Sequence, residues 1–214
     1  MILPFELCSE RLELRADRTL YWPSLKTLLL ADPHFGKAET FRAASVPVPG
    51  DAMLSLAKLS RALEESHAER LLILGDFWHA RAGRNRQVLD DLDHWRSRHT
   101  ALHIDLIRGN HDRAGLPPPS WADRWHPRLL EPPFLFAHHP EPSDDGYVLC
   151  GHLHPGYQVT GRGRQKLKVP CFWFGDRVGV LPAFGAFTGL AFVTPAPADR
   201  LVLIAGDVLI GKSQ

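Results

Sequence analysis

The sequence predicts an α/β protein in which a parallel sheet is followed by a second, more antiparallel sheet. In the first half of the 214 residues, buried strands alternate with amphipathic helices, as they do in parallel βαβ units. In the second half, short strands and turns dominate. The two halves therefore predict two sheets that pack against each other.

Strands in the first half read as continuous apolar runs, the pattern of strands that are buried on both faces. Three such runs predict buried strands at 27–31, 71–74 and 102–107. Two shorter strands are predicted before them, one around Leu12 and Leu14 and one at 20–23. Strands that alternate with helices in this way predict a parallel arrangement.

Two amphipathic helices are predicted between these strands, each with apolar residues recurring on one face. The first is predicted to begin at Asp51, its N-cap, and to end near His67, and the second to span 86–99. The segment that precedes the first helix is predicted to be irregular, because Pro47 and Pro49 break regular structure.

The second half predicts a series of short strands. They are expected at 134–137, 147–150, 157–160, 167–174, 178–181, 191–193 and 201–205. Gly161–Arg164 is predicted to form a hairpin turn, because glycine tolerates positive φ. The stretch between Asp112 and the first of these strands is predicted to be rich in loops, since prolines cluster in it.

The composition limits the class of protein. With 44% hydrophobic and 23% charged residues, 1–214 is expected to form a single globular domain. A formal net charge of +1 gives no general attraction for nucleic acid or a membrane. Three scattered cysteines predict free thiols in a reducing compartment. Without a signal peptide or a run of ~18 apolar residues, the cytoplasm is the expected location and no membrane partner is expected.

Side chains suited to binding metals or protons follow five of the predicted strands directly. They are Asp32 and His34; Asp76; Asn110, His111 and Asp112; His138; and His152 and His154. In open α/β sheets, chemistry gathers beyond the carboxyl ends of the strands. A lone aspartate at such a position more often caps the next helix. The repetition at five strand ends favours a shared site.

The residue types narrow the chemistry of that site. His152 and His154 are two apart in an extended segment and so point the same way. The absence of cysteine from the set argues against a structural thiolate zinc site. Carboxylates, imidazoles and one amide oxygen suit Mn²⁺, Fe or Zn²⁺, and the sequence does not choose among them. Two such ions ~3.5–4 Å apart are the usual clamp for hydrolysing phosphate esters.

The same residues resemble, in order, the five motifs of the calcineurin-like metallophosphoesterases. The motifs are Asp32-x-His34, Gly75-Asp76, Gly109-Asn110-His111-Asp112, the His138 strand end and Gly151-His152-x-His154. Three further segments, 31–37, 46–50 and 181–189, resemble one bacterial branch, the DNA-ligase-associated endonuclease/phosphodiesterases of the DNA damage response. The resemblance implies a four-layer α/β/β/α sandwich with two mixed sheets flanked by helices.

The resemblance further implies an enzyme, a metal-dependent phosphoesterase that hydrolyses phosphodiester bonds, most simply as a nuclease in DNA repair. Two divalent metal ions are expected, with Mn²⁺ favoured over Zn²⁺ or Fe. The expected partners are DNA or another phosphodiester substrate, together with DNA ligase or repair proteins. Three alternatives stay open: a phosphomonoesterase, a cyclic-nucleotide or dinucleotide hydrolase, and a non-catalytic protein-binding scaffold.

Roles for the site residues also follow from the resemblance. One metal is expected to be held by Asp32, His34, Asp76 and His154. The other is expected to be held by Asp76 as a bridge, Asn110, His138 and His152. His111 is expected to protonate the leaving oxygen or stabilise the transferring phosphoryl group, and Asp112 to hold its imidazole. Either His138 or His139 fits the ligand position, and His138 is preferred because it directly follows the strand.

Substrate contacts are predicted less sharply than metal ligands. Arg113, His79 and Lys37 lie in loops after the site strands and are candidates for binding substrate, with a solvated or structural side chain as the alternative. The basic run from Arg162 to Lys168 predicts either a nucleic-acid contact or a solvated hairpin. Trp78 is interpreted as a core residue, with base stacking as the alternative.

Overall fold

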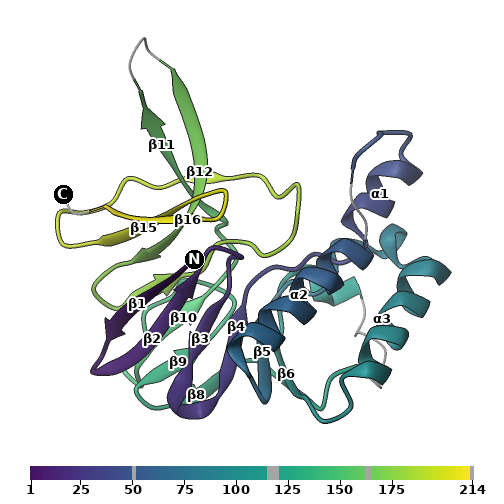
Figure 1. The fold of residues 1–214 in the computed structure, drawn as a ribbon, viewed down its shortest axis with the longest axis horizontal. Coiled ribbons are helices and arrows are strands. Elements are labelled where there is room, and N and C mark those ends of the chain that lie inside the picture. The colour runs from purple at the N-terminus through teal and green to yellow at the C-terminus, as the bar shows by residue number, and fades with distance from the viewer. Residues whose placement is uncertain (50–51, 115–120, 162–164, 213–214) are drawn as a thin grey trace.

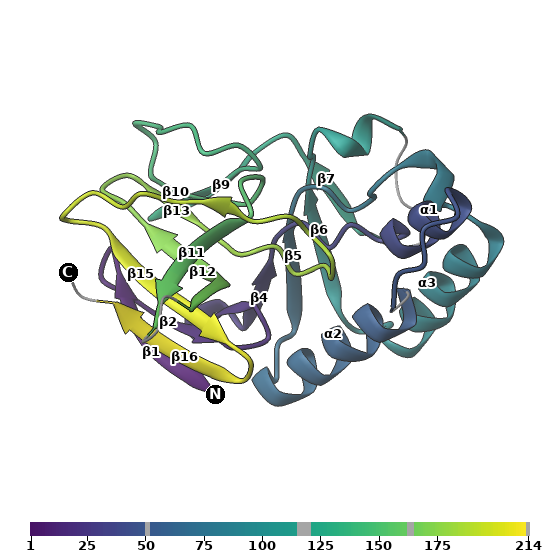
Figure 2. The same cartoon turned by 90° about the horizontal axis from the view of Figure 1, so that it is seen from above.

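The structure is a computed structural model that describes residues 1–49, 52–114, 121–161 and 165–212. It confirms the predicted α/β class, with two mixed sheets and a small number of helices (Figure 1). The helices lie beside the first sheet, and the second sheet follows it in the chain (Figure 2).

The first sheet holds seven strands whose spatial order follows their order in the chain. They are β1 Ile2–Leu7, β2 Glu10–Arg15, β3 Leu20–Trp22, β4 Thr27–Leu30, β5 Arg70–Leu74, β6 His103–Ile107 and β7 Arg124–His126. Strands β1 to β4 pair antiparallel, whereas β4 to β7 pair parallel. The parallel strands β4, β5 and β6 therefore end at one edge of the sheet, which gathers the residues that follow them.

Among the described residues, three α-helices and three short 3₁₀ helices accompany this sheet. They are α1 Lys37–Ala43, α2 Ala52–Ser66, α3 Arg86–Arg98, η1 Pro23–Leu25, η2 Arg81–Gly83 and η3 His111–Ala114. Leu59 of α2 and Leu92 of α3 are fully buried and join one apolar cluster with the side chains of β4, β5 and β6. Asn85 caps α3 by accepting a hydrogen bond from the Val88 amide at 2.9 Å. Asp51, the predicted cap of α2, lies outside the described residues.

The second sheet carries the remaining strands. They are β8 Leu129–Glu131, β9 Phe134–Phe136, β10 Tyr147–Cys150, β11 Pro155–Thr160, β12 Lys166–Phe174, β13 Val178–Val180, β14 Ala191–Phe192, β15 Arg200–Ala205 and β16 Val208–Lys212. Their main order is β14-β11-β12-β13-β10-β9-β8, with β15 and β16 added beside β12. Strands β11 and β12 continue as a hairpin that projects from the molecule (Figure 1).

A shared apolar cluster joins the two sheets. Leu14 and Leu72 of the first sheet contribute to it, together with Phe134, Phe136 and Phe172 of the second, and all five are fully buried. Burial of this much apolar surface holds the two sheets face to face. In the part of the chain that the structure describes, no helix is long and apolar enough to cross a membrane.

The segment predicted to be irregular before Pro49 contains helix α1, so that prediction was wrong in part. A seven-residue helix is too short to be stable alone and depends on tertiary contact. That contact comes from η2, because a Cβ atom on Gly83 would lie only 2.0 Å from the Gly36 carbonyl oxygen at the start of α1. The sequence pattern alone does not show that these two glycines meet.

Several edge strands were also absent from the prediction. They are β1, β7, β8 and β16. β1 begins with an exposed Ile2 and contains an exposed Pro4, and only its last residue, Leu7, is buried. Such strands lack the continuous apolar run that marks β4 to β6, and their pairing partner supplies the stability.

Candidate metal centre

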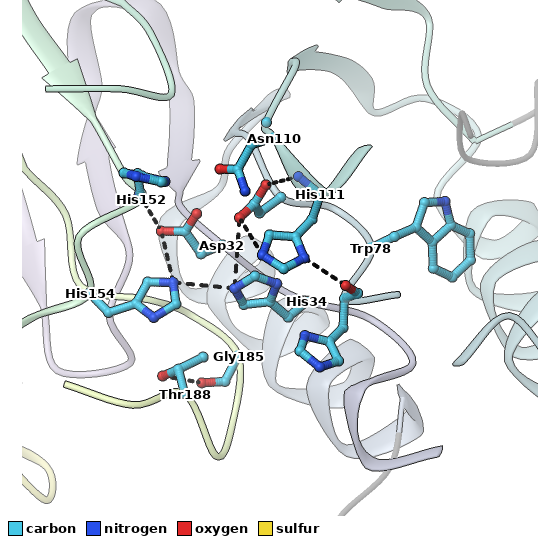
Figure 3. Close-up of polar contacts among 12 residues, drawn as sticks. Asp32, His34, Trp78, Asn110, His111, His152, His154, Gly185 and Thr188 are labelled. Carbon is cyan, nitrogen blue, oxygen red and sulfur yellow. Dashed lines mark hydrogen bonds and ion pairs between the residues drawn. The ribbon is translucent and has the colours of Figure 1, made fainter. Parts of the chain in front are cut away.

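The predicted site residues converge where the ends of β4, β5 and β6 meet the ends of β9 and β10. Asp32, Asp76 and Asn110 follow the three strands of the first sheet, and His138 and His152 follow the two strands of the second. Figure 3 shows the side chains from the two sheets pointing toward one common space. Two sheets thus supply one cluster of carboxylates and imidazoles.

The backbone is strained at five of these positions. Asp32, His34, Asp76, His152 and His154 have φ values of 50°, 48°, 48°, 70° and 48°, in the left-handed region. Residues other than glycine rarely adopt this conformation, and such strain concentrates at functional sites. The fold therefore holds these side chains in place at a cost in backbone energy.

One group of side chains surrounds the first half of the centre. Ligand atoms of Asp32, His34 and His154 all lie within 4.8 Å of one another. The Nε2 atoms of His34 and His154 are 3.2 Å apart, and His154 Nε2 lies 3.6 Å from Asp32 Oδ2. Asp32 Oδ1 is buried without a hydrogen-bond partner among the described residues. An oxygen in this position gains most from a bound cation.

A second group surrounds the other half. His138 Nε2 lies 2.8 Å from Asn110 Oδ1 and 3.1 Å from His152 Nδ1. Asp76 stands between the two groups, with Oδ1 at 3.4 Å from His138 Nε2 and Oδ2 at 4.0 Å from His34 Nε2. Each carboxylate oxygen of Asp76 therefore faces a different half of the centre, as a bridging ligand requires.

The electrostatics of the cluster favour a bound cation. Burial and the neighbouring Asp76 raise the pKa of Asp32 well above its ordinary value. Burial and the proximity of His154 lower the pKa of His34 to about 2, and burial followed by Lys37 lowers the pKa of His154 to about 4. The imidazoles are therefore neutral at pH 7 and offer lone pairs, while the buried carboxylates repel each other. Divalent metal ions fit this set of donors.

Surrounding backbone groups orient the carboxylates and imidazoles of the cluster. The backbone amide of His152 donates to Asp32 Oδ2 at 2.8 Å, and the amide of His111 donates to Asp76 Oδ1 at 2.9 Å. His138 Nδ1 lies 3.1 Å from the carbonyl oxygen of Leu74, which fixes the ring so that Nε2 faces the centre.

Two glycines make room for these contacts. A Cβ on Gly75, whose φ is +88°, would lie 2.1 Å from His138 Nδ1. A Cβ on Gly109 would lie 2.2 Å from Asp76 Oδ1. The glycines of the second and third motifs are therefore required by close approach of the metal-site side chains.

The choice between His138 and His139 is supported by burial and direction. His138 is 2% exposed and faces Asp76 and Asn110, whereas His139 is exposed. The ring centroid of His139 lies 4.4 Å from that of His152, so His139 lies at the rim of the second group. This geometry favours His138 as the ligand.

Asp112 does not hold the imidazole of His111, which corrects the expectation from the sequence. Its carboxylate accepts hydrogen bonds from the Gly109 amide at 2.9 Å and the Trp78 amide at 3.2 Å. The ring of His111 is held instead by the carbonyl oxygen of His79, 2.8 Å from its Nδ1 (Figure 3). Asp112 thus braces two site loops, and the turn after Gly109 directs its carboxylate away from the His111 ring.

Asp112→Ala is therefore expected to act on stability first. The substitution leaves two backbone donors without their acceptor, which lowers the free energy of unfolding by roughly 1–3 kcal/mol. Urea denaturation of the metal-free protein measures the change, with Asp112→Asn as the control that keeps an acceptor oxygen. A loss of turnover equal to that of His111→Ala, at unchanged stability, would support the original role.

Two of the predicted substrate contacts, His79 and Lys37, lie beside residues of the centre. The His79 ring stacks on the His111 ring with centroids 5.7 Å apart, and Lys37 lines a cavity together with His34. The side chain of Arg113 and residues 162–164 of the basic run lie outside the described part. Trp78 is 1% exposed and points away from the cluster (Figure 3), which confirms its interpretation as a core residue.

The loop from Gly185 to Ala191 supports the centre, and its residue types did not predict this role. The Gly185 amide donates to the Asp32 carbonyl oxygen at 3.2 Å, and the Ala191 amide donates to that of His154 at 3.1 Å. A Cβ on Gly185 would meet the Pro33 carbonyl oxygen at 2.5 Å. The glycines of this segment were the available signal, because close backbone approach is one use of glycine.

Among solved structures, a nuclease is similar to the whole chain. The crystal structure of the Pseudomonas putida nuclease MPE has a TM-score of 0.86 and 43% sequence identity, over 99% of this chain and 100% of that chain. The E. coli phosphoesterase YfcE has a TM-score of 0.35 and 16% identity over 86% of this chain and 90% of its own. No protein-family model and no curated protein matches the chain.

The fold, the convergent strand ends and the near-complete structural match define the class as a metallophosphoesterase. The chain belongs to the calcineurin-like metallophosphoesterase superfamily, in the same branch as the Pseudomonas putida nuclease MPE.

Proposed function

We propose that the protein is a metal-dependent phosphoesterase that hydrolyses phosphodiester bonds as a nuclease. The observation that carries the proposal is the position of Asp76, whose two carboxylate oxygens face two separate groups of metal-competent side chains. The similarity to a nuclease over 99% of the chain supports a nucleic-acid or other phosphodiester substrate. Residues 1–214 would act as one domain.

We assign the metal ligands as the sequence suggested. One site takes Asp32, His34, Asp76 and His154. The other takes Asp76, Asn110, His138 and His152. When bound, two divalent ions supply a hydroxide at neutral pH and neutralise charge on the attacking and leaving oxygens. The buried Asp32 oxygen that lacks a hydrogen-bond partner among the described residues and the neutral imidazoles support this assignment.

His111 is assigned the role of general acid, which donates a proton to the leaving oxygen. With Nδ1 held by the His79 carbonyl oxygen, the ring directs Nε2 toward the centre, 4.0 Å from Asp76 Oδ2. The side chain is 42% exposed, so it reaches both substrate and solvent. A histidine in this position donates a proton to the departing alkoxide and is reprotonated from water.

The finer parts of the proposal rest on the composition and the resemblance. We propose Mn²⁺ as the metal, the cytoplasm as the location and DNA repair as the context. The segments 31–37, 46–50 and 181–189 support the repair context, and an association with DNA ligase rests on that resemblance alone. Carboxylate and imidazole ligands without thiolates suit Mn²⁺.

Removal of metal tests the proposal directly. Chelation is expected to abolish hydrolysis of a nitrophenyl phosphodiester, and reloading with Mn²⁺ is expected to restore it with two equivalents bound. Metal analysis and turnover are measured on the same sample, with Zn²⁺ and Fe²⁺ loaded in parallel. A protein that binds less than one equivalent and turns over nothing would instead be a non-catalytic scaffold.

A panel of substrates separates the remaining enzymatic alternatives. The metal-loaded protein is compared on single-stranded DNA, double-stranded DNA, a phosphomonoester and a cyclic nucleotide. The proposal expects the DNA substrates to be cleaved internally with the highest kcat/KM. A preference for the monoester or the cyclic nucleotide would reassign the substrate while leaving the metal chemistry in place.

A further inference from the structure

A cleft opens beside the metal centre on the side of His34. It has a volume of about 270 Å³, and its polar lining includes His34, Lys37 and Glu39. Ala186 and Phe187 line it from the loop that supports Asp32, and Leu54 lines it from α2. Figure 3 shows Gly185 and Thr188 of the same loop close to His154 and His34. The cleft thus joins the metal centre to an apolar wall.

Phe187 is the feature of this wall that the metal chemistry does not explain. Its side chain is 47% exposed, although most large aromatic residues of this chain are buried. Its φ is +57°, a strained value for a bulky residue. An exposed aromatic ring held in a strained conformation beside a catalytic centre offers a flat surface for a base.

The same surface continues into a second, larger cavity. This cavity has a volume of about 620 Å³ and shares Leu54, Ser55 and Ala186 with the first. It is also lined by Arg18 and Lys58, which donate to backbone carbonyls of residues 183–185, just before Phe187. The two cavities adjoin at these shared residues and together form the groove, with His34 and Phe187 lining the first and the two cationic side chains lining the second.

Among the described residues, Arg18 and Lys58 contact neutral groups, which for Lys58 include the Phe184 ring, whose centroid lies 3.9 Å from Nζ. Arg18 Nη1 donates to the carbonyl oxygens of Ala183 and Gly185 at 3.1 and 3.3 Å, and Lys58 Nζ donates to that of Phe184 at 3.2 Å. Among the described residues, no carboxylate lies within ion-pair distance of either cation.

Other cations of the cavity are paired, which makes these two distinct. Arg15 and Arg61 form ion pairs with Glu65, and Arg15 also pairs with Asp17. Burial and then Arg18 lower the pKa of Lys58 to about 7, with Asp17 opposing the shift. An anion placed between Arg18 and Lys58 would offset their mutual repulsion.

We propose that this groove binds the part of a nucleic-acid strand that flanks the scissile phosphate, with a base against Phe187 and a backbone phosphate at Arg18 and Lys58. The proposal rests on the proposed nuclease function. The exposed Lys166 and Lys168 on the projecting β11–β12 hairpin offer a different path for the strand. The groove is favoured because its lining includes His34 itself.

Binding of a labelled DNA oligonucleotide tests the groove separately from turnover. Fluorescence anisotropy is measured on metal-loaded protein that carries His111→Ala, so that cleavage is slowed. Adding Phe187→Ala is expected to raise Kd about 5- to 150-fold, the range for losing one stacked base. Adding Lys58→Met is expected to raise Kd as well, because it removes a phosphate contact. Lys58→Met is also expected to reduce the slope of log Kd against log salt by about 1.

Matched controls give the result its meaning. Phe192 is 50% exposed and Lys26 is 57% exposed, and both lie outside the groove lining. Phe192→Ala and Lys26→Met are expected to leave Kd unchanged. Where Phe187→Ala lowers the melting temperature, Phe187→Leu replaces it, because leucine keeps apolar bulk without a flat ring.

Three outcomes overturn the groove. An unchanged Kd in both groove variants would show that the groove does not bind the strand. A larger rise in Kd with Phe192→Ala than with Phe187→Ala would place the strand on the hairpin side. A third result would make the cavity a site for free phosphate. In it, inorganic phosphate raises the melting temperature only when Lys58 is present, and Lys58→Met leaves the Kd for the oligonucleotide unchanged. Absent turnover on DNA together with Phe187-dependent binding contradicts the nuclease function alone.

Discussion

Asp76→Asn is expected to lower turnover of a phosphodiester by about 10²–10⁴-fold. Weaker metal binding takes away several kcal/mol of transition-state stabilisation and so raises the activation free energy. The substitution is nearly isosteric. Asn can still accept the hydrogen bond from the His111 amide, now 2.9 Å from Oδ1. What disappears is the charge that faces both halves of the centre. Metal analysis is expected to show fewer bound equivalents than in the unsubstituted protein.

Stability supplies a second readout for this variant. Without metal, Asp76 repels Asp32 and raises its pKa, so Asp76→Asn is expected to leave the metal-free protein at least as stable. On adding Mn²⁺, the unsubstituted protein gains stability by mass action and the variant gains less. Asp90→Asn on the exposed face of α3 serves as the charge-matched control. Normal metal content with near-normal turnover would contradict Asp76 as the bridge.

The fold was most predictable where strands are buried on both faces. The runs at 27–31, 71–74 and 102–107 became β4, β5 and β6, because continuous apolar stretches between polar loops have few other stable states. Edge strands and α1 were missed, since their stability comes from contacts such as Gly36 with Gly83. Such contacts join residues that are distant in the sequence and leave no periodic pattern.

The site was predictable because its residues sit at strand ends, where topology alone brings them together. Asp32, Asp76 and His138 converge as expected, and their ligand atoms lie within 4.8 Å of one another. The role of Asp112 was not predictable, because the direction of its carboxylate depends on how the turn after Gly109 closes. The partner that replaced it, the His79 backbone carbonyl, carries no side-chain signal at all.

His111→Ala is expected to lower kcat by about 10²–10⁴-fold, the usual contribution of a positioned general acid. Metal content is expected to stay at that of the unsubstituted protein, because the His111 ring is not among the assigned ligands. The backbone amide of His111 donates to Asp76 Oδ1 at 2.9 Å, and alanine keeps that amide, whereas the 4.0 Å approach of the ring to Asp76 Oδ2 is lost. This combination separates the variant from Asp76→Asn, which loses metal and turnover together.

The leaving group distinguishes proton donation from a structural effect of the same substitution. A nitrophenolate leaves readily without a proton, whereas the alkoxide of a nucleotide does not, so the loss from His111→Ala is expected to be larger on DNA than on the nitrophenyl diester. His79→Ala is the matched control. It removes a neighbouring imidazole, but the backbone carbonyl of residue 79 still accepts from His111 Nδ1 and holds the His111 ring in place. An equal loss on both substrates would mean that His111 stabilises the phosphoryl group instead, since that charge develops with either leaving group.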